Sequence, residues 1–178
     1  MSAGQQDHSG QQETQPDRKM VFFSSADAPT IEEDGMMSPP KIDKAVYTQL
    51  DISPVADGQH VTVLFKGEGP NGFSLVYSWF GAGFRLPRHS HSADCLYYVL
   101  SGEIRMGSRT LRRGDGFFIR ADAPYGYTAG PDGAEVLEFR AATSFDMKIF
   151  DQTPERWRPI VEAAVANRER WLATRPGS

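Results

Sequence analysis

The feature that most constrains the fold is a rhythm of short apolar runs separated by glycine-rich turns, between about His60 and Ala142. Runs of about four to eight residues rich in β-branched and aromatic side chains are typical of strands. Turn clusters such as Pro70-Asn71-Gly72 and Gly130-Pro131-Asp132-Gly133 separate them, and no long helical period intervenes. The pattern predicts an all-β protein, an antiparallel sandwich or barrel. The expected strands are His60–Phe65, Phe73–Phe80, Leu96–Leu100, Ile104–Met106, Gly116–Ile119 and Ala134–Arg140.

The segments on either side of this region have a different composition. Residues 1–19 contain almost no large apolar side chains, which predicts a disordered tail. Residues 20–59 mix short apolar pieces with turn clusters, and we expect them to wrap the core. Residues 143–178 form a helical extension, since Ile160, Ala164 and Trp171 share one helix face and Pro159 suits a first turn. The apolar face either covers the barrel or contributes to a dimer contact.

Composition excludes several classes of function. The 178 residues carry a net charge of −4, which indicates one domain and offers no basic field for nucleic acid. No apolar run approaches the roughly 18 residues of a membrane span, and the first residues do not resemble a signal peptide. We therefore expect a soluble, cytoplasmic protein without a membrane partner. Cys95 is the only cysteine, which excludes an intramolecular disulfide and a four-cysteine zinc site.

The strongest candidate for a chemical site is the sequence His89-Ser90-His91. Residues two apart in a strand point to the same face, so both imidazoles would enter the barrel and could share one ion. Two histidines on one inward face would be awkward in a purely apolar core. The pair therefore favours a metal site.

Two stretches resemble the motifs of the cupin superfamily. Gly83, His89, His91 and Gly102 match the first motif, and Gly114-Asp115 through Pro124-Tyr125 resembles the second. The resemblance covers residues 60–142 and implies a single cupin-type antiparallel β-barrel, or jelly roll, that forms a homodimer. In a typical metal-binding cupin, three histidines and a glutamate hold one divalent ion. Here Cys95 occupies the glutamate position and Tyr125 the third-histidine position.

Several interpretations of the departing positions remain open. Cys95 is a thiolate ligand beside the histidines or a small buried hydrophobe. Asp94 replaces the glutamate through a β-bulge or is a turn residue. Tyr125 binds the metal, a metal-bound water or the substrate, or it is a core aromatic.

Two further residues are less specific. Arg85 shares strand parity with His89, so it reaches inward to anchor a carboxylate or enolate, or lies at the rim in water. Glu138 is an acid or base inside the barrel or, on the face opposite Leu137 and Phe139, a solvent-facing residue.

These observations lead to two functional hypotheses. The first is a metal-dependent small-molecule enzyme, most simply a dioxygenase, with lyase or isomerase activity as alternatives. Its metal ligands would be His89, His91 and Cys95, its catalytic residues Tyr125 and Arg85, and its ion Fe(II), with Zn, Mn, Ni or Cu as alternatives. The second is a cupin that has lost its metal site and binds or senses a small ligand, such as an aromatic or carboxylate, in a pocket lined by Tyr97, Tyr125 and Tyr127.

Overall fold

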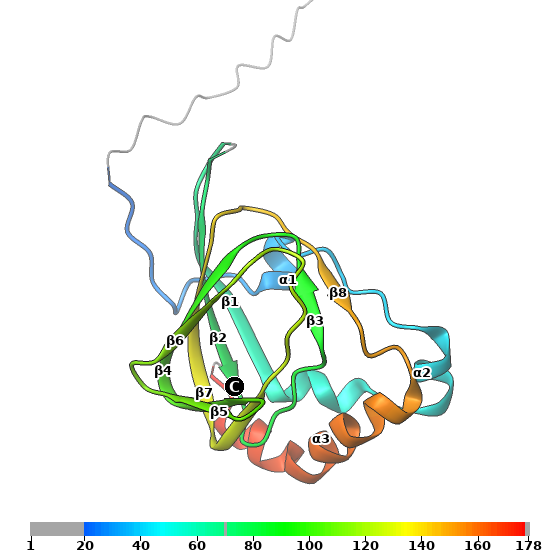
Figure 1. The fold of residues 1–178 in the computed structure, drawn as a ribbon. Coiled ribbons are helices and arrows are strands. Elements are labelled where there is room, and N and C mark those ends of the chain that lie inside the picture. Colours follow the sequence, from blue (N-terminus) through cyan, green and yellow to red (C-terminus); the bar gives the residue numbers. More distant parts are fainter. Residues whose placement is uncertain (1–19, 70, 177–178) are drawn as a thin grey trace, which may run out of the picture.

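The computed structural model describes residues 20–69 and 71–176, so the predicted tail at residues 1–19 lies outside the described residues. The strands curl around one interior, and a long helix runs beneath one end of them (Figure 1). This is the predicted all-β architecture with a C-terminal helix. No helix in the described part of the chain is long and apolar enough to cross a membrane.

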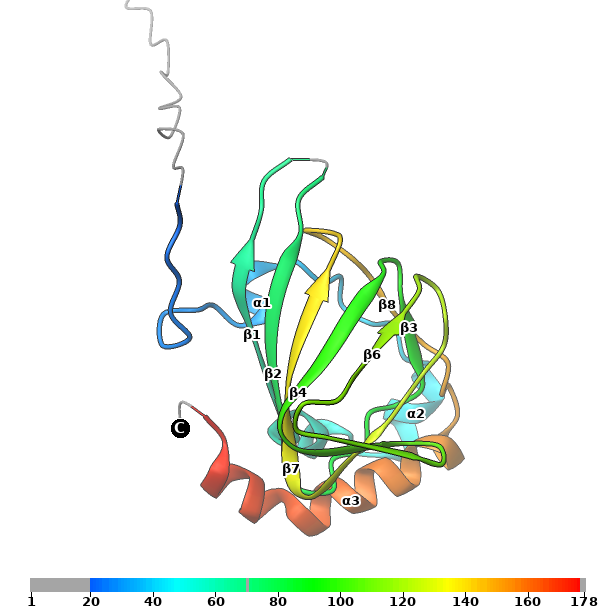
Figure 2. The same cartoon turned by 60° about the vertical axis from the view of Figure 1, so that its left-hand side comes forward.

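The main sheet is antiparallel throughout, and strands far apart in the sequence lie side by side (Figure 2). Its order is β1-β2-β7-β4-β5, and β6 also pairs with β4. The opposite wall is a two-stranded sheet of β3 and β8, joined to the chain before β7 by a bridge between His89 and Tyr125. The strands are β1 Gln59–Lys66, β2 Ser74–Phe80, β3 His89–His91, β4 Cys95–Met106, β5 Arg109–Arg112, β6 Gly116–Ile119, β7 Thr128–Arg140 and β8 Met147–Ile149.

Side chains in the Cys95–Val99 part of β4 and the Val136–Arg140 part of β7 alternate between the interior and the outside. In β4, Cys95, Tyr97 and Val99 are buried, whereas Leu96 and Tyr98 are about half exposed. In the second half of β7, Val136, Glu138 and Arg140 are buried and Phe139 is outside. This register aims polar side chains into the barrel and leaves large apolar ones on its outer surface.

Two predicted turns are instead irregular points within long strands. The expected break at Ser101-Gly102 lies inside β4, whose register against β7 shifts on both sides of it, and Gly130-Pro131-Asp132-Gly133 lies inside β7. Gly102 has φ 66°, and a Cβ there would lie 2.1 Å from the carbonyl oxygen of Gly133. Glycine is therefore required for the close approach of two bulged strands, not for a chain reversal.

The C-terminal helix α3, Pro154–Thr174, covers the end of the barrel. It begins before Pro159, which lies inside the helix rather than in its first turn, and β8 precedes it. Trp157, Ile160, Ala164 and Trp171 are buried. The Trp171 indole packs near Phe84 and its Nε1 donates to the carbonyl of Ala82 at 2.9 Å. The helix thus has the covering role, with its apolar face buried within the chain.

The segment before β1 forms three short helices: α1 Ile31–Asp34, α2 Lys44–Gln49 and the 3-10 helix η1 Ser53–Gly58. The chain ahead of α1 lies against β1, where the Val63 amide donates to the carbonyl of Pro29 at 2.9 Å. Met37 then forms a bridge with Phe145, just ahead of β8. The segment consequently runs along one side of the barrel and supplies part of the wall of its interior cavity.

Candidate functional site

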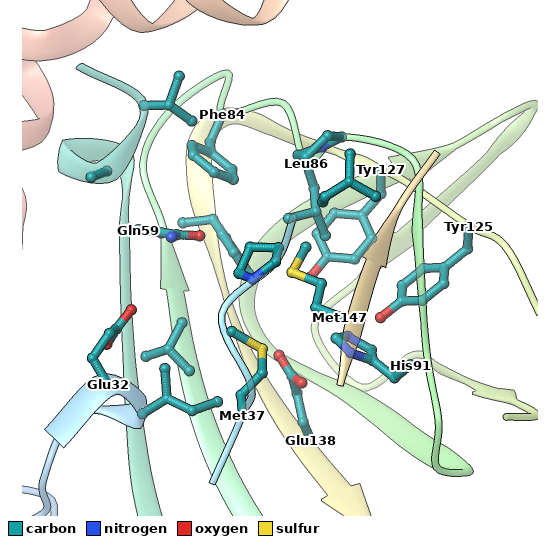
Figure 3. Close-up of a pocket in the computed structure, with 18 of the residues that line it drawn as sticks. Glu32, Met37, Gln59, Phe84, Leu86, His91, Tyr125, Tyr127, Glu138 and Met147 are labelled. Carbon is teal, nitrogen blue, oxygen red and sulfur yellow. The ribbon is translucent and has the colours of Figure 1, made fainter. Parts of the chain in front are cut away.

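The barrel encloses a cavity of about 300 Å³ (Figure 3). Most of its wall is apolar and comes from the segment before β1, from β1, from the chain around Phe84 and from β8. The polar residues around it include His91, Tyr97, Tyr125, Glu138 and Arg140. In Figure 3 the Tyr125 hydroxyl and the His91 imidazole lie together, and the Glu138 carboxylate points into the same space. We refer to these five residues as the polar wall.

Both histidines of β3 face the interior, as their spacing predicts. His89 is 1% exposed and His91 7%, and their ring centroids are 4.8 Å apart. The Nδ1 atom of His89 lies 2.8 Å from the carbonyl oxygen of Pro87, and that of His91 lies 2.7 Å from the carbonyl oxygen of Asp146. A carbonyl only accepts, so each Nδ1 carries the hydrogen and each Nε2 keeps its lone pair.

The surroundings keep both imidazoles uncharged near neutral pH. Burial, and then the neighbouring His91, lower the pKa of His89 to about 4. Burial, and then the Arg140 guanidinium, lower the pKa of His91 below its ordinary value. Desolvation disfavours the charged form of an imidazole, so each Nε2 is available as a neutral acceptor or metal ligand.

A buried ion pair lies at the centre of the polar wall. Arg140 Nη2 is 2.5 Å from Glu138 Oε2, and the Ser78 hydroxyl donates to Glu138 Oε1 at 2.6 Å. Burial alone would raise the pKa of Glu138, but Arg140 and Ser78 together hold it below its ordinary value of 4.5. Both partners therefore remain charged, and the pair is neutral overall.

Two tyrosines extend this network toward the cavity. Arg140 Nη2 also donates to the Tyr97 hydroxyl at 3.1 Å, and the hydroxyls of Tyr97 and Tyr125 share a short hydrogen bond. Burial, then the nearby Glu138, raises the pKa of Tyr125, so it is a neutral phenol. Tyr127 also lines the cavity, and its hydroxyl makes no hydrogen bond to a described residue.

The structure brings together only part of the predicted site. His89, His91 and Tyr125 meet, since the rings of His89 and Tyr125 are 4.3 Å apart. Cys95 is 1% exposed and packs in the main apolar cluster, and burial raises the pKa of its thiol to about 12. The structure thus places it as a buried hydrophobe.

Arg85 and Asp94 also lie apart from the cavity. The expectation that Arg85 reaches inward is wrong: it is exposed, whereas its neighbours Phe84 and Leu86 line the cavity. Pro87 and the irregular chain before β3 break the strand parity on which that expectation rested. Asp94 is a loop residue whose carboxylate accepts from the Ala121 amide at 2.7 Å.

Sequence reasoning identified His91 and Tyr125 of the polar wall and left Glu138 open between an inward and an outward position. Arg140 was not singled out. Of the two interpretations of Glu138, the solvent-facing one is wrong, since the residue is 7% exposed and turned inward. Tyr97 lines the cavity as the ligand-binding hypothesis expects, but its hydrogen bonds to Arg140 and Tyr125 were not predicted. The available signal was the Glu-x-Arg spacing of Glu138 and Arg140, which places two opposite charges on one strand face.

The donor set falls short of a complete metal site. Structural and catalytic transition-metal sites normally use three or four protein ligands. In residues 20–69 and 71–176, no three His, Cys, Asp or Glu side chains are close enough to hold one ion. The nearby carboxylate, Glu138, is already bound by Arg140 and Ser78. The residues present therefore supply two imidazoles without the carboxylate or thiolate that would complete the site.

Among known proteins, similarity to this chain is found only in three-dimensional structure. No family model matches the chain, and no curated protein matches it. Among solved structures, the polyketide cyclase RemF from Streptomyces resistomycificus is 16% identical, with 81% of this chain and 96% of RemF covered and a TM-score of 0.52.

Two further structures are similar over most of their own length. A protein of unknown function with a cupin-like fold from Ralstonia eutropha JMP134 is 16% identical, with 85% of this chain and 89% of that chain covered and a TM-score of 0.48. KdgF from Halomonas sp. is 19% identical, with 69% of this chain and 94% of KdgF covered and a TM-score of 0.45. One of the similar structures, RemF, is a named enzyme. At sequence identities of 16% to 19%, the similarity shows a shared fold alone.

Proposed function

We propose that the cavity of this cupin-like barrel binds a small, mainly apolar molecule through one oxygen-bearing group. The observation that carries this proposal is the asymmetry of the cavity, whose lining is mostly apolar and whose polar groups gather mainly at the polar wall and the adjacent Tyr127, with Glu32 and Gln59 elsewhere in the lining. Small-molecule sites are typically apolar pockets in which a few placed polar groups fix the ligand's orientation. This arrangement supports the ligand-binding hypothesis.

Size and chemistry limit the ligand. A volume of about 300 Å³ is at the lower end of the usual range for ligand pockets. Phe84, Tyr127 and Trp157 supply aromatic surface, so a flat one- or two-ring body would gain most from burial. RemF is a polyketide cyclase, so a protein of similar fold can be an enzyme. A similar fold does not imply that this chain has the activity of RemF.

The test is a binding experiment with 2-acetylnaphthalene, which combines an apolar two-ring body with one carbonyl oxygen. We expect saturable binding with an increase in the melting temperature, since a ligand at about 100 times its Kd adds about 2.7 kcal/mol. Val61→Phe fills part of the cavity wall and should weaken binding at least tenfold. Val165→Phe, the same change at a residue 63% exposed on α3, is the matched control and should leave the Kd unchanged.

Two results would overturn this proposal. One is the absence of saturable binding of the probe to the wild-type protein. The other is an equal loss of affinity in both variants, because the effect of Val61→Phe would then not arise from the cavity.

The metal-dependent dioxygenase is the second candidate, and one observation favours it. Both imidazoles of the pair are fixed by carbonyl acceptors, which leaves two Nε2 atoms free on neighbouring rings. A divalent ion such as Fe(II) would need its remaining donors from water or substrate. Elemental analysis of protein purified without an affinity tag or chelator tests this candidate. Near-stoichiometric metal that disappears in His89→Ala would support it, and metal-free protein after incubation with excess divalent ions would exclude it.

A further inference from the structure

The two charged side chains of the polar wall, Arg140 and Glu138, are not equally accessible from the cavity. The Arg140 side chain is 2% exposed, and its Nε and Nη1 atoms are buried with no hydrogen-bond partner among the described residues. Phe145 packs against the guanidinium, with Cζ 4.2 Å from the ring centroid. The Glu138 side chain is 9% exposed and points into the cavity. A ligand therefore meets the carboxylate more directly than the guanidinium.

The hydrogen-bond pattern determines which donors a ligand meets. Tyr97 accepts from Arg140, and its hydroxyl also bonds to that of Tyr125. If Tyr125 donated in that bond, the buried Tyr97 hydrogen would be left with only the weak sulfur acceptor of Cys95, because Tyr97 is only 1% exposed. Tyr97 is therefore the donor, and the Tyr125 hydrogen is free for a ligand. A chain that starts at a cation polarises each successive hydroxyl and strengthens this last donor.

On this side of the cavity, the groups that face the ligand are consequently neutral hydrogen-bonding groups and one compensated anion, whereas Glu32 and Gln59 line the cavity elsewhere. Tyr125 and Tyr127 offer hydroxyl hydrogens, and His91 offers the lone pair of Nε2. Arg140 already neutralises Glu138, so no uncompensated positive charge is left to receive an anion. A carboxylate brought into the cavity would leave the site with a net negative charge among mainly apolar side chains.

We propose that the cavity selects uncharged ligands, taking a ketone, phenol or alcohol through Tyr125 and Tyr127 and rejecting carboxylates because Glu138 neutralises Arg140. This inference rests on the proposed ligand-binding function and adds the charge class of the ligand. It narrows the expectation from the sequence, in which a carboxylate ligand was one alternative.

The first experiment compares three probes of similar shape on the wild-type protein at pH 7: 2-acetylnaphthalene, 2-naphthoate and 2-ethylnaphthalene. We expect the ketone to bind at least tenfold more tightly than the carboxylate and more tightly than the hydrocarbon. Equal or tighter binding of 2-naphthoate would overturn the inference and leave the proposed binding function intact. Binding of none of the probes would overturn the proposed function itself, and the inference with it.

The second experiment asks whether Glu138 sets this selectivity. Glu138→Gln removes the negative charge while keeping an acceptor for Ser78, so the Arg140 charge becomes available to an anion. The affinity for 2-naphthoate relative to the ketone should rise at least tenfold. Glu135→Gln is the matched control: it is the same change on the same strand, with the side chain on the opposite face, and should leave the ratio unchanged. An unchanged ratio in folded Glu138→Gln would refute the role of Glu138, and if that variant does not fold, the wild-type series decides the inference.

Discussion

Replacing Arg140 by methionine should destabilise the protein by more than the loss of an ordinary hydrogen bond. Methionine keeps an unbranched apolar chain against Phe145 but removes the guanidinium. Glu138 then retains only the Ser78 hydroxyl as a partner while it stays buried. Removing one member of a buried ion pair leaves an uncompensated charge, which costs about 3–5 kcal/mol. In a domain of this size that loss lowers the melting temperature by roughly 6–20 °C.

The measurement is urea-induced unfolding at pH 7, monitored by tryptophan fluorescence and circular dichroism. The slope of the unfolding free energy against urea concentration is compared between variants. The double variant Glu138→Gln and Arg140→Met removes both charges. It should be more stable than Arg140→Met alone, because no buried charge is left unpaired. A loss below about 1 kcal/mol in Arg140→Met, or a double variant whose loss equals the sum of the single losses, would refute the account of the pair.

Three further outcomes follow from the fold. Trp171→Ala removes a fully buried indole from α3 and should cost about 3–5 kcal/mol of unfolding free energy in the same urea assay. Gly102→Ala should cost more than about 1 kcal/mol, because its φ is positive and its new Cβ would meet the Gly133 carbonyl. A cost near zero would show that the bulge is adaptable. The lowered pKa of Glu138 means that its stabilising contribution is present at neutral pH and lost as the pH falls through the folded-state pKa, below 4.5. Stability measured from pH 6 to pH 3 should decrease less steeply in the variant that lacks both Glu138 and Arg140.

The sequence predicted the fold because its local signals agree with one another. Runs with strand propensity, turn residues and the two motifs all indicate one barrel, and the spacing of His89 and His91 correctly places both imidazoles inside. Long strands were divided wrongly at Gly102 and at Gly133, because a glycine that permits a bulge has the same sequence signal as a glycine that permits a turn.

The polar wall was harder to predict for a physical reason. The alternation of polar and apolar residues identifies the inner face of a strand only when the outer face is polar. Here the outer faces of β4 and β7 carry Leu96, Tyr98 and Phe139. Apolar outward residues made Glu138 look solvent-facing. The inward charge at Glu138 is tolerated because Arg140 lies two residues away on the same face and because Ser78 of β2 donates to the carboxylate, a contact that depends on strand register.

The measurement that tests the central claim most directly is the affinity for 2-acetylnaphthalene before and after removal of the two cavity hydroxyls. Tyr125→Phe with Tyr127→Phe keeps both rings and their packing but removes the donors that would hold the carbonyl oxygen. We predict that the Kd rises at least tenfold in a variant that remains folded, as expected when a buried carbonyl loses its hydrogen bonds. An unchanged Kd would contradict the claim that the polar wall orients a ligand inside this barrel.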